Sequence, residues 1–329
     1  MAPRQNAGFF LGYGAAPIPF GLPLFGRDSR VFFVDYTNGL DGNPGTSVLK
    51  PLKTLDRLHD LMTAGRNDVG FILGDGSTTA TQRLSESLTW SKNACHLIGV
   101  TAPNMVAHRA RISHLTTATT NINPLMTVSA SGCIFANFSY FQGIGQASTD
   151  EQLLVVSGSR NWFWNVHFGG MGHANGAARA GSYVLGLSGG ENLFEKCTIG
   201  LETTARSAAN ASVVLQGSSA QRNKFLDCDF QMYPTANSPL FLDAATAGVL
   251  NGSTMHFKNC SFRTLMNASG STQPSVNCTV NAAVNGTIYF DRCTTGAAKW
   301  AAATAQVKVA SGQDEDGFNG GVFASAADS

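Results

Sequence analysis

A short aromatic motif recurs six times in this chain at a nearly constant interval. In each copy an aromatic residue is followed three positions later by an apolar residue, often cysteine, and two positions later usually by another. The lead aromatics of successive copies are 28, 31, 31, 32 and 33 residues apart. A near-constant period of this size indicates a stacked, quasi-one-dimensional array, so we expect a solenoid. The six copies are Phe135/Phe138/Tyr140, Phe163/Val166/Phe168, Phe194/Cys197/Ile199, Phe225/Cys228/Phe230, Phe257/Cys260/Phe262 and Phe290/Cys293/Thr295.

Each period also contains a second apolar run before the motif. Val128, Val156 and Leu187 each stand seven residues before a lead aromatic, and later copies keep such a run at looser spacing. The runs are short, rich in β-branched and aromatic residues, and separated by Ser, Gly and Asn clusters. These features predict strands rather than helices.

The three-residue step within the motif predicts a corner. Side chains alternate along a strand, so an aromatic and an apolar residue three apart cannot both face inward unless the chain bends between them. Four of the six residues at the bend are Asn or Asp, which tolerate left-handed backbone better than other non-glycine residues. We expect a tight corner with Asn stacked on Asn. The six bend residues are Asn137, Asn165, Lys196, Asp227, Asn259 and Arg292.

Strand, corner, strand and loop repeated about every 31 residues describe an all-β fold, a single-stranded right-handed parallel β-helix of about eight coils. An antiparallel sandwich with chance periodicity is the alternative. In the β-helix, the lead aromatics and the motif cysteines form columns along the interior. The expected core columns are Phe163, Phe194, Phe225, Phe257 and Phe290, with Cys197, Cys228, Cys260 and Cys293.

Composition narrows the partners. Charged residues make up 13% of the chain and the net charge is +1, which disfavours a nucleic-acid or anionic membrane surface as the main partner.

The seven cysteines include no CxxC pair and no Cys/His cluster with zinc spacing, so we expect no metal and no cofactor. Buried, reduced cysteines suggest assembly in a reducing cytoplasm. A disulfide ladder or a metal site along the cysteine column is the alternative.

Residues 1–30 differ from the rest because Gly or Pro interrupts a run of large apolar residues at nearly every other step. The prolines at 17, 19 and 23 break any signal-peptide or transmembrane helix. Such a segment plugs the end of the solenoid, crosses to a neighbouring subunit, or inserts into another protein as an anchoring arm. We expect the last of these, an arm that anchors the protein to another protein. Its apolar residues are Phe9, Phe10, Leu11, Tyr13, Ile18, Phe20, Leu22, Leu24 and Phe25.

Residues 31–62 carry the most specific local pattern. A strand-like run at 31–35 is followed by Asn38-Gly39-Leu40-Asp41, then Pro44-Gly45-Thr46, then Pro51-Leu52-Lys53-Thr54. This order resembles the opening of pectate-lyase-like β-helix proteins. The resemblance implies a short helix that covers the end of the solenoid, and Leu55, Leu58, Leu61 and Met62 have helical spacing after Thr54 as N-cap.

The resemblance extends over about residues 31–296. Together with the different composition of the two ends, it divides the chain into four parts: an arm at 1–30, a cap at 31–66, the β-helix at 67–310 and a flexible tail at 311–329. It specifies fold better than activity, because the scaffold carries polysaccharide lyases, glycoside hydrolases, phage tailspikes and inert structural parts.

Catalysis would require paired carboxylates, or a carboxylate with a basic residue, on one exposed face. The candidates are Glu195, Asp227 and Asp229, with His167 two coils away in the register of Asp229. Asp227 is already explained as a corner residue, and the motifs of glycoside hydrolases and lyases of this fold are missing. The glycine-rich loop at 169–173 is either a flexible loop or the wall of a substrate cleft. We expect a protein that is not an enzyme, or otherwise a polysaccharide lyase or glycoside hydrolase.

These observations together favour a structural surface protein of a tailed-phage virion. We expect a homotrimeric head decoration, cement or spike protein, located on the virion surface and anchored to the major capsid protein or another virion protein. The alternative is a tailspike that binds or degrades host surface polysaccharide.

Overall fold

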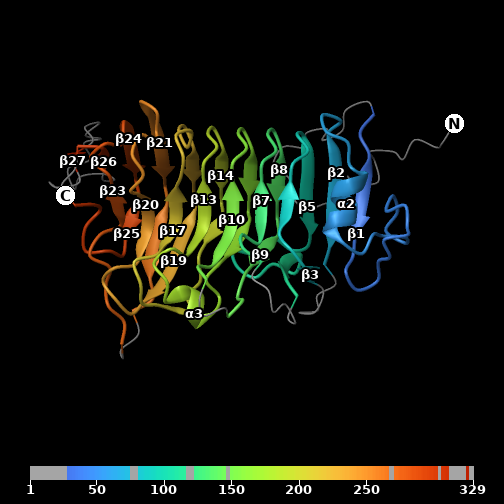
Figure 1. Ribbon diagram of the computed structural model, residues 1–329, viewed down its shortest axis with the longest axis horizontal. Coiled ribbons are helices and arrows are strands. Elements are labelled where there is room, and N and C mark those ends of the chain that lie inside the picture. The colour runs from blue at the N-terminus through green and yellow to red at the C-terminus, as the bar shows by residue number, and fades with distance from the viewer. Residues whose placement is uncertain are drawn as a thin grey trace.

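The computed structural model describes residues 28–74, 81–115, 122–145, 149–266, 270–302, 305–310 and 324–325. The chain forms a right-handed parallel β-helix, a rod whose coils follow one another along its long axis (Figure 1). The predicted all-β solenoid is confirmed. The expected arm, with its nine anchor residues, and the expected tail fall almost entirely outside the described residues.

Three sheets run along the rod, and their strands are parallel except at the last one, β27. Sheet A consists of β1 (Val31–Val34), β2 (Asp68–Leu73), β5 (Cys95–Val100), β8 (Ile134–Ala136), β11 (Trp162–Trp164), β14 (Leu193–Glu195), β18 (Lys224–Leu226), β21 (Ser253–Lys258), β24 (Gly286–Asp291), β26 (Val307–Ala310) and β27 (Ala324–Ser325). Sheet B consists of β4 (Leu88–Trp90), β7 (Met126–Val128), β10 (Gln152–Val156), β13 (Tyr183–Leu187), β17 (Ala211–Leu215), β20 (Leu240–Ala244) and β23 (Cys278–Val280). Sheet C consists of β3 (Thr81–Leu84), β6 (Arg111–His114), β9 (Ser139–Phe141), β12 (His167–Gly169), β15 (Thr198–Ile199), β19 (Asp229–Pro234), β22 (Ser261–Thr264) and β25 (Thr294–Thr295), with β16 (Ala205–Arg206) beside β19.

Each coil passes from sheet A to sheet C to sheet B. Because sheet B has seven strands, the described residues form seven complete coils, and an eighth coil has only β24 and β25. The prediction of about eight coils is therefore one too high for complete turns. In the eighth coil the third strand is reduced to an isolated bridge between Ala301 and Cys278.

The predicted corner between sheets A and C is present in all six motif copies. Its residues have φ between 48° and 60°, the left-handed region. Asn165 donates from Nδ2 to Oδ1 of Asn137 at 2.8 Å, so two of the corner asparagines are stacked as expected. Lys196 and Arg292 adopt the same backbone with side chains exposed to solvent, so the corner does not require a short polar residue.

The lead aromatics form a continuous column in the core. Phe163, Phe194, Phe225, Phe257 and Phe290 are each fully buried, and neighbouring rings lie 4.5–4.9 Å apart and within 15° of parallel. This spacing matches the distance between paired strands, so the ring stack and the backbone ladder have the same repeat.

The motif cysteines form a second column beside the rings. The thiols of Cys197, Cys228 and Cys260 each point at the carbonyl of the lead phenylalanine one coil earlier, at 3.3–3.4 Å. All seven cysteines are free thiols. Burial raises the pKa of Cys278 to about 12, so this thiol stays protonated at neutral pH.

Sequence reasoning missed a buried asparagine ladder at the corner between sheets B and A. Asn161, Asn192 and Asn223 are almost wholly buried and stand 31 residues apart. Oδ1 of each accepts a backbone N–H one coil earlier: from Cys133, Asn161 and Asn192 respectively, at 2.9 Å. The ladder supplies hydrogen bonds where the chain leaves the sheets.

Helix α2 (Leu55–Leu61) covers the N-terminal end of the rod, and α3 (Ala174–Ala177) lies in a loop between sheets C and B (Figure 1). Thr54 is the N-cap of α2, because its Oγ1 accepts the backbone N–H of Arg57 at 3.2 Å. Leu58 packs over Gly70 so closely that a Cβ there would lie 2.6 Å from its methyl group. The helix therefore closes the core as predicted.

Candidate functional site

The structure separates the four catalytic candidates. Glu195 points outward from β14 on sheet A, whereas Asp229 points outward from β19 on sheet C. Asp227 lies between them at the corner and accepts from Asn259 Nδ2 at 3.0 Å. His167 shares a row with Asp229, since both pair with Thr198 of the intervening coil. Only this last relationship places two candidates on one face.

Asp229 forms an ion pair with Arg263. Arg263 donates to both carboxylate oxygens, with Nε 2.8 Å from Oδ1 and a second contact between Nη2 and Oδ2. This hydrogen-bonded carboxylate raises the pKa of Arg263 further above its usual value. A carboxylate held by a guanidinium fork is poorly placed to act as a nucleophile or base.

His167 is also fully engaged. Its Nδ1 accepts from the backbone N–H of Ala107 at 3.1 Å, so its Nε2 carries the proton and donates to the carbonyl of Gly200 at 3.1 Å. Burial lowers the pKa of His167 to about 4, which keeps the ring neutral. His167 therefore fastens the loop before β6 to sheet C.

Other carboxylates on the rod have structural partners as well. Glu191 accepts from Arg160 and Arg222 at 2.6 Å in a ladder along the corner between sheets B and A. Asp243 accepts from Thr279 at 2.9 Å. Within the described ranges, no group of three or more His, Cys, Asp or Glu residues could hold a metal ion. None of the helices described here is long and apolar enough to span a membrane.

The glycine-rich loop at 169–173 covers a buried carboxyl that sequence reasoning missed. Glu151 is 3% exposed, and its Oε1 accepts the backbone N–H of Gly172 at 3.1 Å. Its Oε2 has no hydrogen-bond partner. Burial raises the pKa of Glu151 to about 8 against the opposing effect of the loop N–H groups. No pattern in the sequence distinguishes this residue from the adjacent Asp150.

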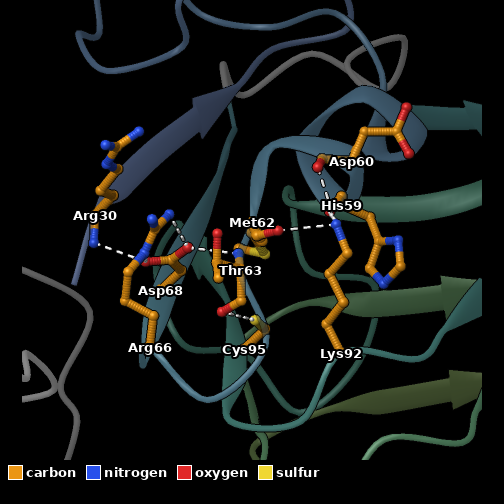
Figure 2. A network of polar contacts seen from close by, with 9 residues as sticks. All are labelled: Arg30, His59, Asp60, Met62, Thr63, Arg66, Asp68, Lys92 and Cys95. Carbon is orange, nitrogen blue, oxygen red and sulfur yellow. Dashed lines mark hydrogen bonds and ion pairs between the residues drawn. The ribbon is translucent and has the colours of Figure 1, made fainter. Parts of the chain in front are cut away.

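The N-terminal cap is held to the first coil by a polar network (Figure 2). Asp68 is fully buried and accepts from the backbone N–H groups of Arg30 and Thr63 at 2.8 Å, and from Arg66 at 2.5–2.7 Å. Burial alone would raise its pKa, but the Arg66 guanidinium and the two N–H groups outweigh burial and hold it below the usual range. The carboxylate joins three segments of the cap.

Lys92 holds the end of helix α2. Its Nζ donates to the carbonyls of His59, Asp60 and Met62 at 2.6–2.9 Å, as Figure 2 shows. A cation at the C-terminus of a helix satisfies unpaired carbonyls and interacts favourably with the helix dipole. The cap is thus fixed to the rod by two charged side chains.

This fixed cap presents apolar side chains to solvent. Leu49 is 88% exposed and Leu40 is 64% exposed, and Val48 between them in sequence is also exposed. They lie in the loop between β1 and α2, next to a pocket of about 430 Å³ lined by Arg30, Phe32, Asn43 and Arg57 among others. We call Leu40, Val48 and Leu49 the cap patch. Strongly exposed leucines that share one loop make that loop a candidate contact surface.

Sheet A carries a second apolar surface on its outer side. One outward row, in register across five strands, consists of Phe33, Phe71, Ile98, Ala136 and Trp164. Together with Val69 they form a buried cluster separate from the core. Beyond Trp164 the same row continues as Glu195, Leu226, Lys258 and Asp291, so it becomes polar at β14. We call the apolar part the outer apolar face.

Comparison with solved structures finds the same architecture. The pectin methylesterase from Aspergillus niger, in penultimately deglycosylated form, superposes with a TM-score of 0.54 at 14% identity over 90% of each chain. The pectate lyase Pel9A gives a TM-score of 0.51 at 15% identity, covering 81% of this chain and 64% of its own. What they share is the fold. Identities this low carry no activity across, and the sequence matches no family model and no curated protein.

Proposed function

We propose that this protein is a structural rod that attaches to a larger particle by its N-terminal end. The observation that carries the proposal is the cap patch, which is strongly exposed on a loop whose backbone is tied down by Asp41: its Oδ1 accepts the backbone N–H groups of Lys53 and Thr54 at 2.9 Å. Because the loop backbone is already held, docking orders little additional backbone, and the exposed apolar side chains gain burial of their area. The occupied carboxylate of Asp229 and the neutral, doubly bound His167 support a structural role over a catalytic one.

The particle we propose is the virion of a tailed phage, with the rod as a head decoration, cement or spike protein in three copies per unit. Seven free thiols favour assembly in a reducing cytoplasm. A surface protein made in that compartment is expected of a virion, which forms inside the host cell.

The attachment is tested by incorporation into particles. The double variant Leu40→Asp/Leu49→Asp should reduce incorporation at least tenfold, because a docked patch would have to bury two charges. Leu265→Asp/Met266→Asp is the matched double control, since Leu265 is 39% and Met266 is 53% exposed and both follow β22, far from the cap in sequence and fold. Incorporation is measured on gradient-purified virions, and the mass of the free protein tests the trimer. Full incorporation of the double variant would refute the proposal.

The alternative is a polysaccharide-binding or polysaccharide-cleaving tailspike. Its support is the fold shared with the two pectin-related enzymes and the position of Glu195, a half-buried carboxylate in register with Trp164. Purified protein incubated with host capsule or lipopolysaccharide should release no reducing ends. Release that is lost in Glu195→Ala or Asp229→Ala would favour the enzyme instead.

A further inference from the structure

The outer apolar face is buried although it points away from the core. Val69 and Ile98 have no exposed surface, Ala136 is 1% exposed and Trp164 is 7% exposed. Farther along the outer side of the same sheet, Lys224 and Lys258 are exposed. The burial therefore belongs to the apolar stretch from β1 to β11 and not to sheet A as a whole.

The described elements do not account for this burial. In this region the strands of sheet A contact their neighbours in the same sheet. Helix α2, which meets β1, lies on the inward side, where Leu58 packs on Gly70. No described helix therefore covers the outer apolar face, and its burial calls for another segment of the chain.

Sequence and position single out one such segment. The stretches 75–80, 116–121, 146–148, 267–269 and 303–304 contain no large apolar residue. Residues 311–329 contain some, but they follow β26 at the opposite end of sheet A. Residues 1–27 contain nine large apolar residues between positions 9 and 25 and lead directly to β1, at the edge of the outer apolar face.

The length of the segment is sufficient. Five strands at about 4.8 Å spacing make a face about 20 Å long. A fully extended chain of 27 residues reaches on the order of 90 Å. The segment can therefore cross the whole face even with the turns that its glycines and prolines impose.

We propose that residues 1–27 dock on the outer apolar face of their own chain, over β1, β2, β5, β8 and β11. Alternating Gly and Pro suit this task, because Pro lowers the entropy lost on ordering an extended segment and Gly permits close approach to the sheet. The apolar residues at 9–25 then complete a second hydrophobic layer. In this arrangement the cap patch, and not residues 1–27, attaches the rod to a particle.

Site-specific photocrosslinking in the full-length chain tests the docking. A p-benzoylphenylalanine at Leu73, a half-buried position beside the cluster, should crosslink to a peptide within residues 1–27 of the same chain. The same probe at Lys224, on the exposed polar part of sheet A, is the control and should give no such product. Mixing ¹⁴N- and ¹⁵N-labelled chains distinguishes a product within one chain from one between two copies. A crosslink between copies, a crosslink to any other segment, or no crosslink at Leu73 would overturn the proposal.

Protease sensitivity gives an independent measurement. Chymotrypsin should cleave the phenylalanines of residues 9–25 slowly in the native chain and at least tenfold faster in Trp164→Arg. Leu226→Arg is the matched control, because Leu226 lies in the same outward row beyond the apolar part. Equal cleavage rates in the two variants, with the rod folded by circular dichroism, would contradict docking. The crosslink at Leu73 remains decisive if Trp164→Arg does not fold.

Discussion

The rings of Phe194 and Phe225 lie 4.5 Å apart and 7° from parallel, one above the other in successive coils. Their backbones are directly paired between β14 and β18, so the strand ladder fixes the ring stack in place. Both side chains are fully buried in the middle of the column. Core stability and coil register therefore depend on the same residues.

Replacing Phe194 by alanine should destabilise the rod by about 3–5 kcal/mol, the usual cost of deleting a buried phenylalanine. The cavity cannot collapse easily, because the neighbouring rings are held by strands on both sides. Urea unfolding measures the change. Lys224→Ala on the next strand, an exposed position, should change stability by less than about 0.5 kcal/mol. A similar loss of unfolding free energy in both variants would mean that the aromatic column contributes no more to stability than an exposed position does.

The asparagine ladder leads to a second prediction, which concerns buried hydrogen bonds. In Asn192→Ala, the backbone N–H of Asn161 loses its acceptor and the carbonyls of Gly158 and Gly189 lose a donor. Leaving buried backbone groups unpaired should cost about 2–3 kcal/mol. The exposed Asn285→Ala serves as the control for the same chemical change, and the free energy of unfolding is again the readout. Water entering the corner and replacing these bonds would show as a loss below about 1 kcal/mol.

The aromatic column and the asparagine ladder differ in how far each could be predicted from the sequence. Phe194 and Cys197 could be predicted as core because the regular recurrence of the aromatics and the three-residue step are visible in the sequence and are best explained by a corner between two strands of one coil. Asn192 has the same 31-residue recurrence with Asn161 and Asn223, but Asn is common in turns, so its periodicity had no distinctive meaning before the coil was known.

The candidate site was harder to predict from the sequence than the core, for a physical reason. Asp229 has an ordinary sequence context, and its ion pair with Arg263 depends on the pairing of β19 with β22 in the next coil. The outer apolar face was likewise hidden. Phe33 and Phe71 alternate with inward residues, so their strands look like wholly buried β-segments, and only the register shows that half of their side chains face away from the core.

Lys92→Ala should loosen the cap without unfolding the rod. The three carbonyls at the end of α2 lose their cationic donor, a loss we expect to cost about 1 kcal/mol. Hydrogen exchange of the α2 amides should accelerate about fivefold while the amides of β13 stay unchanged. The exposed Lys50→Ala is the charge-matched control and should leave α2 exchange at the native rate. Uniform acceleration in α2 and β13 would contradict a local role for Lys92.

Acid should destabilise the protein through its buried histidines. Burial lowers the pKa values of His96, His108 and His167 to about 4, from 6.5 in the unfolded chain. Between pH 6.5 and 4 the unfolded state therefore binds more protons than the folded state, and stability is lost as pH falls. His167→Gln should cost stability at pH 7 but show a smaller loss between pH 6.5 and 4. Urea unfolding across this range measures both slopes, and equal slopes would remove His167 from the acid response.

Glu151 should give a dependence of opposite sign. Burial raises its pKa to about 8 in the folded protein from 4.5 in the unfolded chain, so the folded state keeps a proton that the unfolded state releases. The stability associated with the protonated carboxyl is complete below pH 4.5 and is lost as pH rises through 8. The histidines and the buried thiols also contribute between pH 6.5 and 8.5, but they do so equally in the native chain and in a Glu151 variant, so the difference between the two proteins isolates Glu151.

In that interval Glu151→Gln should lose less stability than the native chain, because glutamine keeps the size of the side chain and cannot ionise. The difference between pH 6.5 and 8.5 should amount to about 1–2 kcal/mol by the relation between pKa and free energy. Glu191→Gln is the matched control: its carboxylate is partly exposed and its pKa is lowered by hydrogen bonding to Arg160, so it should leave this slope unchanged. Parallel stability curves for Glu151→Gln and the native chain would show that the carboxyl ionises freely beneath the 169–173 loop.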